Sequence, residues 1–353
     1  MNLTNLDFSK KKIIIFLVIP TLEIGGTETQ VILLAQKLIK NGFNTKILVR
    51  KNLLNSSSIT SIKPNIVELP NLPGPHPLIL FKLFKTFLNS KSEIVVFSYL
   101  DQMNFSVGFL KLFLNFKWFS SERSDPKVFK DTFFRRLMIY FQRNSLVITN
   151  SDAGLNYYQN IGHRVLKINN FLRFSPTIYN DVSFDKTFYC YSRLVESKNI
   201  IFVLKAWKIA KIDSKLYIIG SGPTESELKQ FVELNNMSNV FFMPDIRDIS
   251  FLQRFSFFIS ASKFEGFPNS AIEALSLNNL LILSDIPSHE SILKTNSKFL
   301  FDLKNVYSLV NVIKWVFRFD FELYSEFLLN QRNILCEFDN EIIFDSYVNL
   351  FQD

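Results

Sequence analysis

Histidine, cysteine and glycine are scarce in this chain: its 353 residues include three, two and ten of them respectively. Cys190 and Cys336 lie far apart and form neither a C-x-x-C pair nor a metal-ligand spacing, so the sequence excludes a disulfide framework and a thiolate metal site. Two isolated cysteines in apolar surroundings suit a reducing compartment. No apolar run approaches the roughly 18 residues of a membrane-spanning helix. We therefore expect a cytoplasmic protein.

The first apolar run, IIIFLVI at residues 13–19, follows a lysine triplet in the manner of a signal peptide. The run is too short for that interpretation, it is followed by Pro20 and Glu23, and no small-residue cleavage pattern stands behind it. A buried first strand is the better interpretation.

The composition is that of a folded protein with a substantial core, because 47% of the residues are hydrophobic and 20% are charged. The formal net charge of +8 favours anionic partners: nucleic acid, an anionic lipid surface or phosphorylated small molecules. Nucleic acid is the weakest of these, because the aromatic residues lie in apolar runs and are not interleaved with arginines as stacking platforms require. We therefore expect no nucleic-acid partner.

Short apolar runs alternate with longer amphipathic stretches along the chain. The stretch from Gly25 to Gly42 fits a helix with basic residues in its last turn. This β-α-β rhythm predicts parallel sheets with helices on both faces. The strand-like runs are residues 13–19, 45–49, 93–97, 117–120 and 145–149, and in the second half they begin at residues 187, 215, 240, 255 and 280.

Two successive β/α series predict an α/β protein with two doubly wound, Rossmann-like domains facing each other across a cleft. We expect residues 1–170 to form the first domain, residues 171–185 a linker and residues 186–334 the second domain. The helical tail, about residues 335–353, is expected to cross back onto the first domain. Ligands of such sheets bind outside the carboxyl ends of the strands, so functional residues are expected just after strands.

Three motifs follow predicted strands. In IPTLEIGGTE, Gly25 and Gly26 let a ligand approach the backbone at a helix start, which attracts phosphate, although a plain flexible turn explains them equally well. In YSRLVESKNI, Arg193 and Lys198 can hold a diphosphate, but most such pairs are simply solvated. The third motif, IIGSGPTESELK at residues 218–229, is interpreted as a strand-to-helix turn that shapes the cleft.

The stretch EGFPNSAIE places two carboxylates, Glu265 and Glu273, on either side of a turn between a predicted strand and a helix. Ser270 and Glu273 have the spacing of a capping box, which explains Glu273 structurally. Glu265 has no such explanation, and we expect it to accept hydrogen bonds from hydroxyl groups at the edge of the sheet. The backbone amides from Asn269 to Ala271, at the helix start, are expected to face an anion.

Taken together, these motifs resemble family 4 retaining glycosyltransferases of the GT-B fold. The resemblance runs over most of the chain, and the E-x7-E element is its most specific part. It implies a nucleotide-diphosphate sugar as the donor, expected to be a UDP-sugar. By the resemblance, Arg193 and Lys198 would neutralise the diphosphate, and the backbone amide of Gly26 would approach its distal phosphate.

The resemblance further implies that Glu265, as the catalytic carboxylate, accepts hydrogen bonds from hydroxyl groups of the transferred sugar. Glu273 would accept them from the ribose, and Asn269 and Ser270 would contact the donor from the helix start. The reaction would proceed with retention at the anomeric carbon, while cations and dipoles stabilise the leaving diphosphate. That scheme needs no metal or other cofactor, and no D-x-D motif stands at a strand end.

Many members of the family carry a histidine after the fifth strand of the first domain. His76, His163 and His289 do not match that place, and we expect them on the surface or in loops. SSERSDP, residues 120–126, puts Glu122 there, so we expect Glu122 to position the acceptor or the donor sugar. SSERSDP is also similar to the S-E-R-x-x-P of bacterial enzymes that add N-acetylgalactosamine or related sugars to lipid-linked oligosaccharides or surface polysaccharide.

One stretch, PLILFKLFKTFL at residues 77–88, has Lys82 and Lys85 on a narrow face and apolar residues elsewhere, and residues 109–119 are comparable. An apolar helix with a basic rim can lie in a membrane interface. A helix buried on the sheet explains the same positions, and we weigh the two interpretations about equally. A lipid-linked acceptor favours peripheral association with the inner face of the plasma membrane.

The expected function is transfer of a hexose or N-acetylhexosamine to a lipid-linked or surface-polysaccharide precursor, such as that of O-antigen or capsule. Two alternatives stay open. The scarcity of histidine and the E-x7-E context disfavour a nucleotide-sugar epimerase of the same fold. A non-catalytic sugar-nucleotide-binding subunit of a membrane glycan-assembly complex gains some weight from the missing histidine and from Ser192 and Asn199, which stand where the family usually has glycine.

Overall fold

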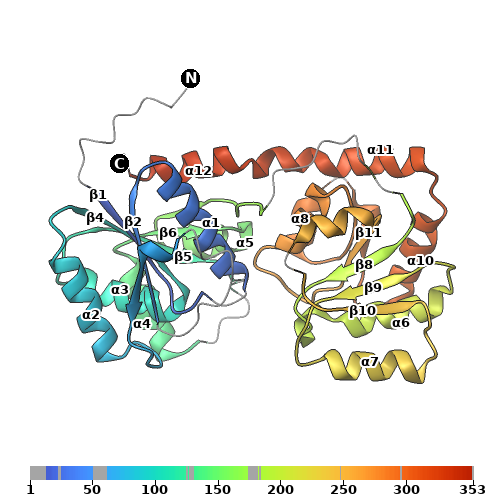
Figure 1. Ribbon diagram of the computed structural model, residues 1–353, viewed down its shortest axis with the longest axis horizontal. Helices are drawn as coiled ribbons and strands as arrows, with labels where there is room; N and C mark the ends of the chain where they lie inside the picture. The colour runs from blue at the N-terminus through green and yellow to red at the C-terminus, as the bar shows by residue number, and fades with distance from the viewer. Residues whose placement is uncertain are drawn as a thin grey trace. The chain divides into compact units, whose positions relative to one another are not determined.

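The computed structural model of the protein describes residues 13–22, 25–50, 62–124, 126, 131–173, 182, 184–246, 248–294 and 296–351. Contacts divide the chain into two compact units: unit 1 is Met1–Phe171 with Glu341–Asp353, and unit 2 is Leu172–Asn340. Each unit contains one parallel sheet with helices packed on it (Figure 1). The predicted α/β class with two doubly wound sheets is confirmed. Most of the expected linker lies outside the described residues.

Unit 1 is built on a seven-stranded sheet in the order β3-β2-β1-β4-β5-β6-β7, and every pairing in it is parallel. Side chains of the central strand β1 alternate between two cores: Ile15 and Leu17 lie in one, Phe16 and Val18 in the other. A strand buried on both faces must be apolar throughout, which explains the continuous run IIIFLV. The strands are β1 (Ile13–Val18), β2 (Asn44–Arg50), β3 (Ile66–Leu69), β4 (Glu93–Tyr99), β5 (Lys117–Glu122), β6 (Leu146–Thr149) and β7 (Val165–Lys167).

Helices cover both faces of this sheet. Leu34 of α1 and Tyr347 of α12 share one core, and Figure 1 shows these two helices close together. Leu83 of α2, Val107 of α3 and Phe141 of α4 belong to the core on the other face. The C-terminal segment is therefore part of unit 1. The helices are α1 (Gly26–Lys40), α2 (Pro77–Leu88), α3 (Leu100–Lys111), α4 (Phe133–Gln142), α5 (Asp152–Asn160) and α12 (Asn340–Asn349).

Unit 2 has a six-stranded parallel sheet in the order β10-β9-β8-β11-β12-β13, with one continuous apolar core. The strands are β8 (Phe188–Tyr191), β9 (Leu216–Ile219), β10 (Val240–Met243), β11 (Phe257–Ser260), β12 (Leu280–Ser284) and β13 (Leu300–Phe301). The helices are α6 (Ile200–Ala210), α7 (Glu225–Leu234), α8 (Asn269–Ser276), α9 (Pro287–Leu293), α10 (Val306–Phe317) and α11 (Phe321–Arg332). The order places β8 between β9 and β11, so the loops after these three strands emerge side by side.

Residues 109–119 do not form the expected amphipathic helix. The helix α3 ends at Lys111 and β5 begins at Lys117, so the segment is a helix end, a turn and a strand start. The reason is that Trp118 and Phe119 are needed on the two faces of the sheet, where they join different cores. The apolar side chains of this segment therefore do not share one face.

Candidate functional site

Four side chains predicted as functional belong to unit 2, and we call them the edge site: Arg193, Lys198, Glu265 and Glu273. Arg193 and Lys198 follow β8, and Glu265 follows the neighbouring strand β11. Because the strands are parallel, both loops leave the sheet at its carboxyl edge, where ligands of such sheets bind. The loops are joined directly, since the amide of Lys263 donates to the carbonyl of Ser197 across 2.8 Å.

Two glycines after β9, Gly220 and Gly222, let the loop after β9 pack directly against the backbone on either side of Arg193. A Cβ on Gly220 would lie 2.0 Å from the carbonyl oxygen of Ser192, and a Cβ on Gly222 would lie 2.2 Å from that of Leu194. No other residue fits backbone so close, and Gly220 also has a φ of +133°. The G-x-G turn therefore shapes the site by letting the loop after β9 pack against the loop after β8.

Polar partners enclose the carboxylate of Glu265. Its side chain is 6% exposed, and its Oε1 accepts a hydrogen bond from Ser262 Oγ at 2.6 Å and lies 2.9 Å from Lys198 Nζ. Burial alone would raise the pKa of Glu265, but the Lys198 ammonium, His289 and the Ser262 hydroxyl outweigh it and hold the pKa at about 2. Glu265 is ionised at neutral pH and links two loops, so the expectation that it lacks a structural role is wrong.

Two of the three histidines are buried, which corrects the expectation that they lie on the surface or in loops. His289 is fully buried beneath Glu265: its Nδ1 lies 3.0 Å from the carbonyl oxygen of Ser284, and its Nε2 lies 3.8 Å from Glu265 Oε1, too far for a hydrogen bond. His163 is buried in unit 1, while His76 is the N-cap of α2. An isolated histidine in the sequence carries no periodic signal that would have shown its burial.

The loop after β8 accommodates Ser192 and Asn199, the two residues that stand where the family resembled by the sequence usually has glycine. Asn199 has left-handed backbone, with a φ of 52° and a ψ of 40°, and asparagine is one of the few residues besides glycine that adopt it routinely. Ser192 buries a hydroxyl that has no partner among the described residues. Arg193 is exposed, and no acidic side chain in the described part of the chain pairs with it. Its guanidinium is therefore available to an anionic ligand.

Glu273 does not cap α8, so the predicted capping box with Ser270 is wrong. The N-cap of α8 is Pro268, and no side chain accepts a bond from the helix start. Both oxygens of Glu273 accept from Arg173 instead: Nε lies 2.6 Å from Oε1, and Nη2 lies 2.6 Å from Oε2. A two-pronged, charge-assisted bond is stronger than one bond to a backbone amide, which explains the outcome.

Asn269 and Ser270 are the first two residues of α8 and are half-buried. The amides from Asn269 to Ala271 were expected to face an anion. Two of them are already used, because Asn269 N–H donates to the carbonyl of Phe267 and Ala271 N–H to that of Pro268, both at 3.0 Å. The turn before the helix folds back on its start and takes these donors. The expectation is therefore wrong for two of the three amides.

Gly26, the remaining predicted donor contact, belongs to unit 1. It is exposed and begins α1 directly after the N-cap Gly25, whose backbone is extended. A Cβ on Gly25 would lie 2.2 Å from Glu28 Oε2, so the Glu28 carboxylate lies against the helix start. An acid there is favourable because the first turn of a helix carries partial positive charge. The GG-x-E motif thus has a local structural basis in unit 1.

Glu122 ends β5 and lies inside unit 1, with its side chain 5% exposed. Its Oε1 accepts from Asn104 Nδ2 at 2.7 Å, its Oε2 lies 3.3 Å from Arg135 Nη2, and Arg135 Nη1 in turn lies 2.6 Å from Asp101 Oδ1. Burial raises the pKa of Glu122, and Arg135 opposes that effect. Both oxygens of Glu122 thus have partners inside unit 1, and this arrangement does not support a contact between Glu122 and a sugar.

The neighbouring Arg123, which the sequence did not single out, ties β5 to the C-terminal helix. Its Nη2 donates to Tyr347 Oη of α12 at 2.7 Å, its Nε donates to Ser121 Oγ at 3.0 Å, and its Nη1 donates to Asn170. Glu122 and Arg123 of the SSERSDP stretch therefore bond to other side chains within unit 1.

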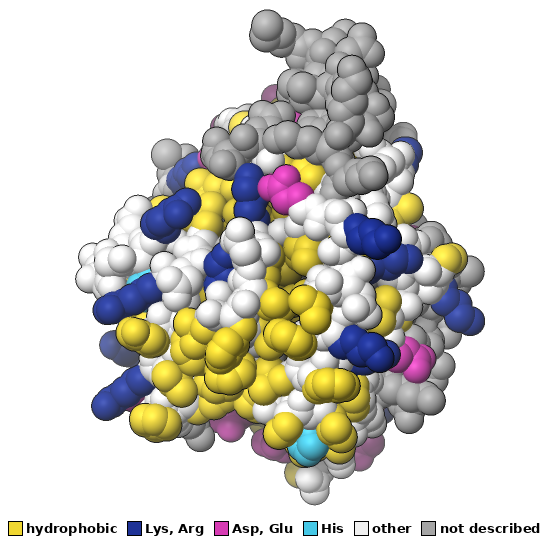
Figure 2. Space-filling model, turned by 90° about the vertical axis from the view of Figure 1, so that its left-hand side faces the viewer, with side chains coloured by type: hydrophobic (Ala, Val, Ile, Leu, Met, Phe, Trp, Pro, Cys, Tyr) yellow, Lys and Arg dark blue, Asp and Glu magenta, His cyan; other side chains and the backbone are white. Residues whose placement is uncertain are grey.

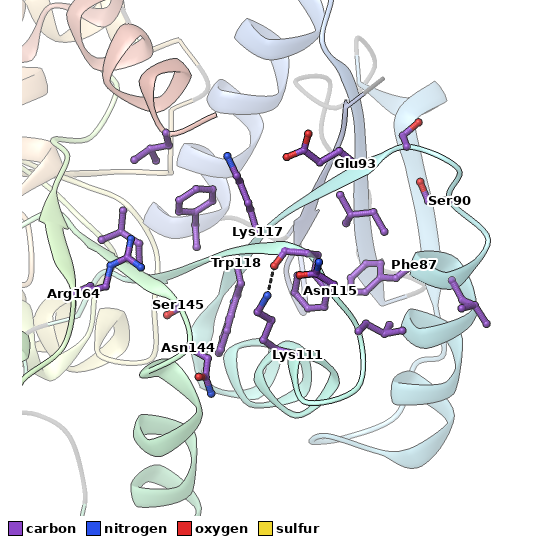
Figure 3. A pocket seen from close by; sticks show the side chains of 18 residues that line it. Phe87, Ser90, Glu93, Lys111, Asn115, Lys117, Trp118, Asn144, Ser145 and Arg164 are labelled. Atoms are coloured by element: carbon purple, nitrogen blue, oxygen red, sulfur yellow. Dashed lines mark hydrogen bonds between the residues drawn. The ribbon is translucent and has the colours of Figure 1, made fainter. Parts of the chain in front are cut away.

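A pocket of about 740 Å³ lies in unit 1, at the opposite edge of its sheet from the strand ends where ligands usually bind (Figure 3). Its lining includes the starts of β4, β5 and β6 and the last residues of α2 and α3. Figure 3 shows Lys111 reaching from α3 and donating to the carbonyl of Phe116. Helices end here with their carbonyl groups, which do not favour phosphate. This pocket therefore lacks the features of a nucleotide site.

The described ranges contain no group of three or more His, Cys, Asp or Glu side chains placed to hold a metal ion. None of the helices described is both long and apolar enough to cross a membrane.

Residues 176–332, within unit 2, match the family described as glycosyl transferases group 1. An uncharacterized glycosyltransferase of Methanocaldococcus jannaschii is 25% identical over 238 residues, which are 58% of this chain and 58% of that relative. The N-acetylgalactosamine-N,N'-diacetylbacillosaminyl-diphospho-undecaprenol 4-alpha-N-acetylgalactosaminyltransferase of Campylobacter jejuni is 33% identical over 103 residues, 29% of this chain and 28% of that protein. The chain thus spans less than two thirds of the length of either relative.

Among solved structures, Anabaena HepE in complex with UDP matches with a TM-score of 0.81 and 16% identity, over 96% of this chain and 99% of that one. At this identity the likeness shows the fold alone, and it is the GT-B fold that the sequence predicted. Residues 176–332 therefore form a glycosyltransferase group 1 domain, and the edge site lies at the carboxyl edge of its sheet.

Proposed function

We propose that this chain is a family 4 retaining glycosyltransferase that moves a hexose or an N-acetylhexosamine from a UDP-sugar to a lipid-linked or surface-polysaccharide glycan precursor. The observation that carries the proposal is the pair of Lys198 and Glu265 at the carboxyl edge of a glycosyltransferase group 1 domain. A cation beside an ionised carboxylate matches the diphosphate and the sugar of such a donor. The diphosphate needs positive charge, and the sugar needs acceptors for its hydroxyl groups.

The diphosphate would be held by Arg193 and Lys198. An ammonium has three N–H donors, and the bond of Lys198 to Glu265 uses one of them. Arg193 is exposed and unpaired among the described side chains, so its fork can take two phosphate oxygens. The backbone amide of Gly26 would approach the distal phosphate from the start of α1.

The sugar and the nucleoside would be held by carboxylates. Glu265 would accept hydrogen bonds from hydroxyl groups of the transferred sugar, because its low pKa keeps it ionised at neutral pH. Glu273 would accept them from the ribose, and the side chains of Asn269 and Ser270 would add contacts from the start of α8. The choice of UDP is supported by HepE, a protein of this fold whose structure contains UDP.

Transfer would proceed with retention and without a resident metal. Charge builds up on the diphosphate as the bond to the anomeric carbon breaks, and preorganised cations stabilise that charge. Arg193 and Lys198 are the cations the edge site provides for this purpose. Ser262 and Lys198 fix the position of the Glu265 carboxylate, which keeps its negative charge from moving toward the leaving diphosphate.

A lipid-linked acceptor is supported by the name of the Campylobacter relative, which describes a diphospho-undecaprenol substrate. The helix α2 of unit 1 leaves Phe81 65% and Leu88 61% exposed, with Lys82 and Lys85 exposed beside them. Figure 2 shows apolar side chains gathered on this side of unit 1 with Lys and Arg side chains around them. Such a face suits an anionic membrane surface. We place the protein in the cytoplasm, peripheral on the inner face of the plasma membrane.

The test is to incubate the purified chain with a panel of nucleotide sugars and bacterial membranes, and to measure both nucleotide release and sugar transfer. We expect both from the wild type, and a loss of at least 100-fold in Glu265→Gln, which keeps the shape of the side chain but removes its charge. Glu196→Gln is the matched control, because Glu196 is a 89% exposed acid in the same unit.

The same assay separates the alternatives. A changed nucleotide sugar that forms without any acceptor would replace the proposal by an epimerase. Binding of a nucleoside diphosphate without turnover, with activity restored only by a partner protein, would replace it by a non-catalytic subunit. Absence of both release and transfer over the whole panel would refute the proposal.

A further inference from the structure

Arg173 stands at the edge site although no motif marks it in the sequence. It comes two residues after Phe171, the last residue of this part of unit 1. Its two nitrogens Nε and Nη2 each lie 2.6 Å from one oxygen of Glu273, and Nη2 also lies 3.3 Å from Tyr191 Oη at the end of β8. The side chain of Arg173 is 29% exposed and that of Glu273 is 7% exposed.

The backbone that leads into Arg173 is fixed independently of Glu273. Asn340 Oδ1 accepts from the amide of Leu172, and Asn340 Nδ2 donates to the carbonyl of Leu172, both at 2.9 Å. Leu172 and Asn340 are the first and last residues of unit 2, so this pair joins the two points at which the chain enters and leaves it. The guanidinium carbon also lies 5.8 Å from the centre of the Tyr191 ring. The position of Arg173 is therefore fixed at its backbone by the Leu172–Asn340 pair and at its guanidinium by Tyr191.

We propose that Arg173 is a positioning residue that presents the Glu273 carboxylate to the ribose of the donor. This inference rests on the proposed function and deepens it. A carboxylate offers about four lone pairs, two on each oxygen. The fork of Arg173 uses one on each oxygen and leaves one on each, and two acceptors at that spacing match the vicinal hydroxyl groups of a ribose.

A purely structural ion pair would give a different result when Arg173 is changed. In that case the variant would lose stability and would bind all nucleotides equally less well. A positioning role predicts a selective loss, because only the contribution of the ribose hydroxyl groups depends on how the carboxylate is oriented. Discrimination between a ribonucleotide and its dideoxy analogue measures that contribution directly.

The experiment compares dissociation constants of uridine diphosphate and 2′,3′-dideoxyuridine diphosphate by titration calorimetry. The wild type should bind the dideoxy analogue at least tenfold more weakly, since hydrogen bonds to a charged group are lost. Arg173→Gln should reduce this ratio to below about threefold, and Arg173→Lys should give an intermediate ratio, because an ammonium supplies charge without a fork. Lys294→Gln, which breaks an exposed ion pair of unit 2, is the control and should keep the wild-type ratio.

The outcomes distinguish a failure of the positioning role of Arg173 from a failure of the proposed function. An unchanged ratio of dissociation constants in both Arg173 variants overturns the inference but leaves the proposed function standing. Tighter binding of uridine diphosphate by Arg173→Gln has the same consequence, because it would mean that Arg173 competes with the ribose for Glu273. A wild type that binds neither nucleotide refutes the donor and the inference together. If Arg173→Gln does not fold, as its thermal midpoint will show, Arg173→Lys carries the test.

Discussion

Lys198 Nζ lies 2.9 Å from Glu265 Oε1, and this contact joins the loop after β8 to the loop after β11. Both residues are predicted to bind the donor, yet each also stabilises the position of the other. The lysine is 24% exposed and the glutamate 6% exposed, so the pair is largely shielded from water. Substitution of either residue therefore changes folding as well as binding, and the two effects must be measured separately.

A double-mutant cycle separates them. Lys198→Met leaves a buried carboxylate without its cation and should lower the free energy of unfolding by about 2–3 kcal/mol. Glu265→Gln should cost about 1–2 kcal/mol, because Lys198 can still reach solvent. The double variant should lose at least about 1 kcal/mol less than the sum of the two, measured by urea unfolding. Additive losses would show that the two side chains do not interact.

The low pKa of Glu265 predicts how stability responds to acid. The group has a pKa of about 2 in the folded protein, below its ordinary value of 4.5, so its contribution is present above pH 4.5 and is lost as the pH falls toward 2. Between pH 6 and pH 3, the wild type should lose about 2 kcal/mol more than Glu265→Gln. All other carboxylates are common to both proteins and cancel in the comparison.

Thermal unfolding of both proteins over that pH range checks the prediction. The wild type should melt higher than Glu265→Gln at pH 6, and this difference in melting temperature should shrink below about pH 4.5 and vanish or change sign by pH 3. Parallel curves would mean that Glu265 has an ordinary pKa and that Lys198 does not neutralise it.

The parts of the fold that the sequence could predict are those set by local periodicity. The run IIIFLV predicts a strand buried on both faces, and the structure has it as β1. The strand β13, which has only two residues, gives no such pattern. The predicted cations and carboxylates of unit 2 could be found because they follow strands, and parallel strands end at one edge.

The pairings of these groups could not be predicted, because they join residues far apart in sequence. Arg173 and Glu273 are 100 positions apart, and an arginine in a linker has no recognisable motif. The capping box failed for the same reason, since spacing alone cannot show a competing partner from elsewhere in the chain. His289 lies in α9 and is fully buried, with its Nδ1 3.0 Å from the carbonyl oxygen of Ser284 at the end of β12, and no spacing in the sequence predicts that burial.

Glu122 should act on stability and not on catalysis. Glu122→Ala removes an acceptor from the buried Arg135 and should lower the free energy of unfolding by about 3 kcal/mol. The KM values for donor and acceptor should stay within twofold of the wild type, because the carboxylate lies inside unit 1. A rise of tenfold or more in either KM, with unchanged stability, would return Glu122 to the role that the sequence suggested.

The exposed apolar side chains of unit 1 should carry membrane binding. We expect the wild type to sediment with vesicles that contain phosphatidylglycerol, and to do so less at high salt, because the electrostatic attraction of the lysines is screened. Phe81→Glu combined with Leu88→Glu places two negative charges on a face that has 65% and 61% exposed apolar side chains, and should reduce binding at least tenfold.

Leu234→Glu is the matched control for that double variant. Leu234 ends α7 in unit 2 and is 75% exposed, so the same substitution there adds charge to an equally open apolar position without touching α2. Binding by this variant should equal that of the wild type. The control adds one negative charge and the double variant adds two. A loss in the control about half as large, on a logarithmic scale, as that in the double variant would therefore mean that net charge alone governs attachment. Full binding by the double variant would show that α2 only covers the sheet. Because none of the three positions lies in the edge site, transfer to a water-soluble acceptor should be unaffected in both variants, which separates attachment from chemistry.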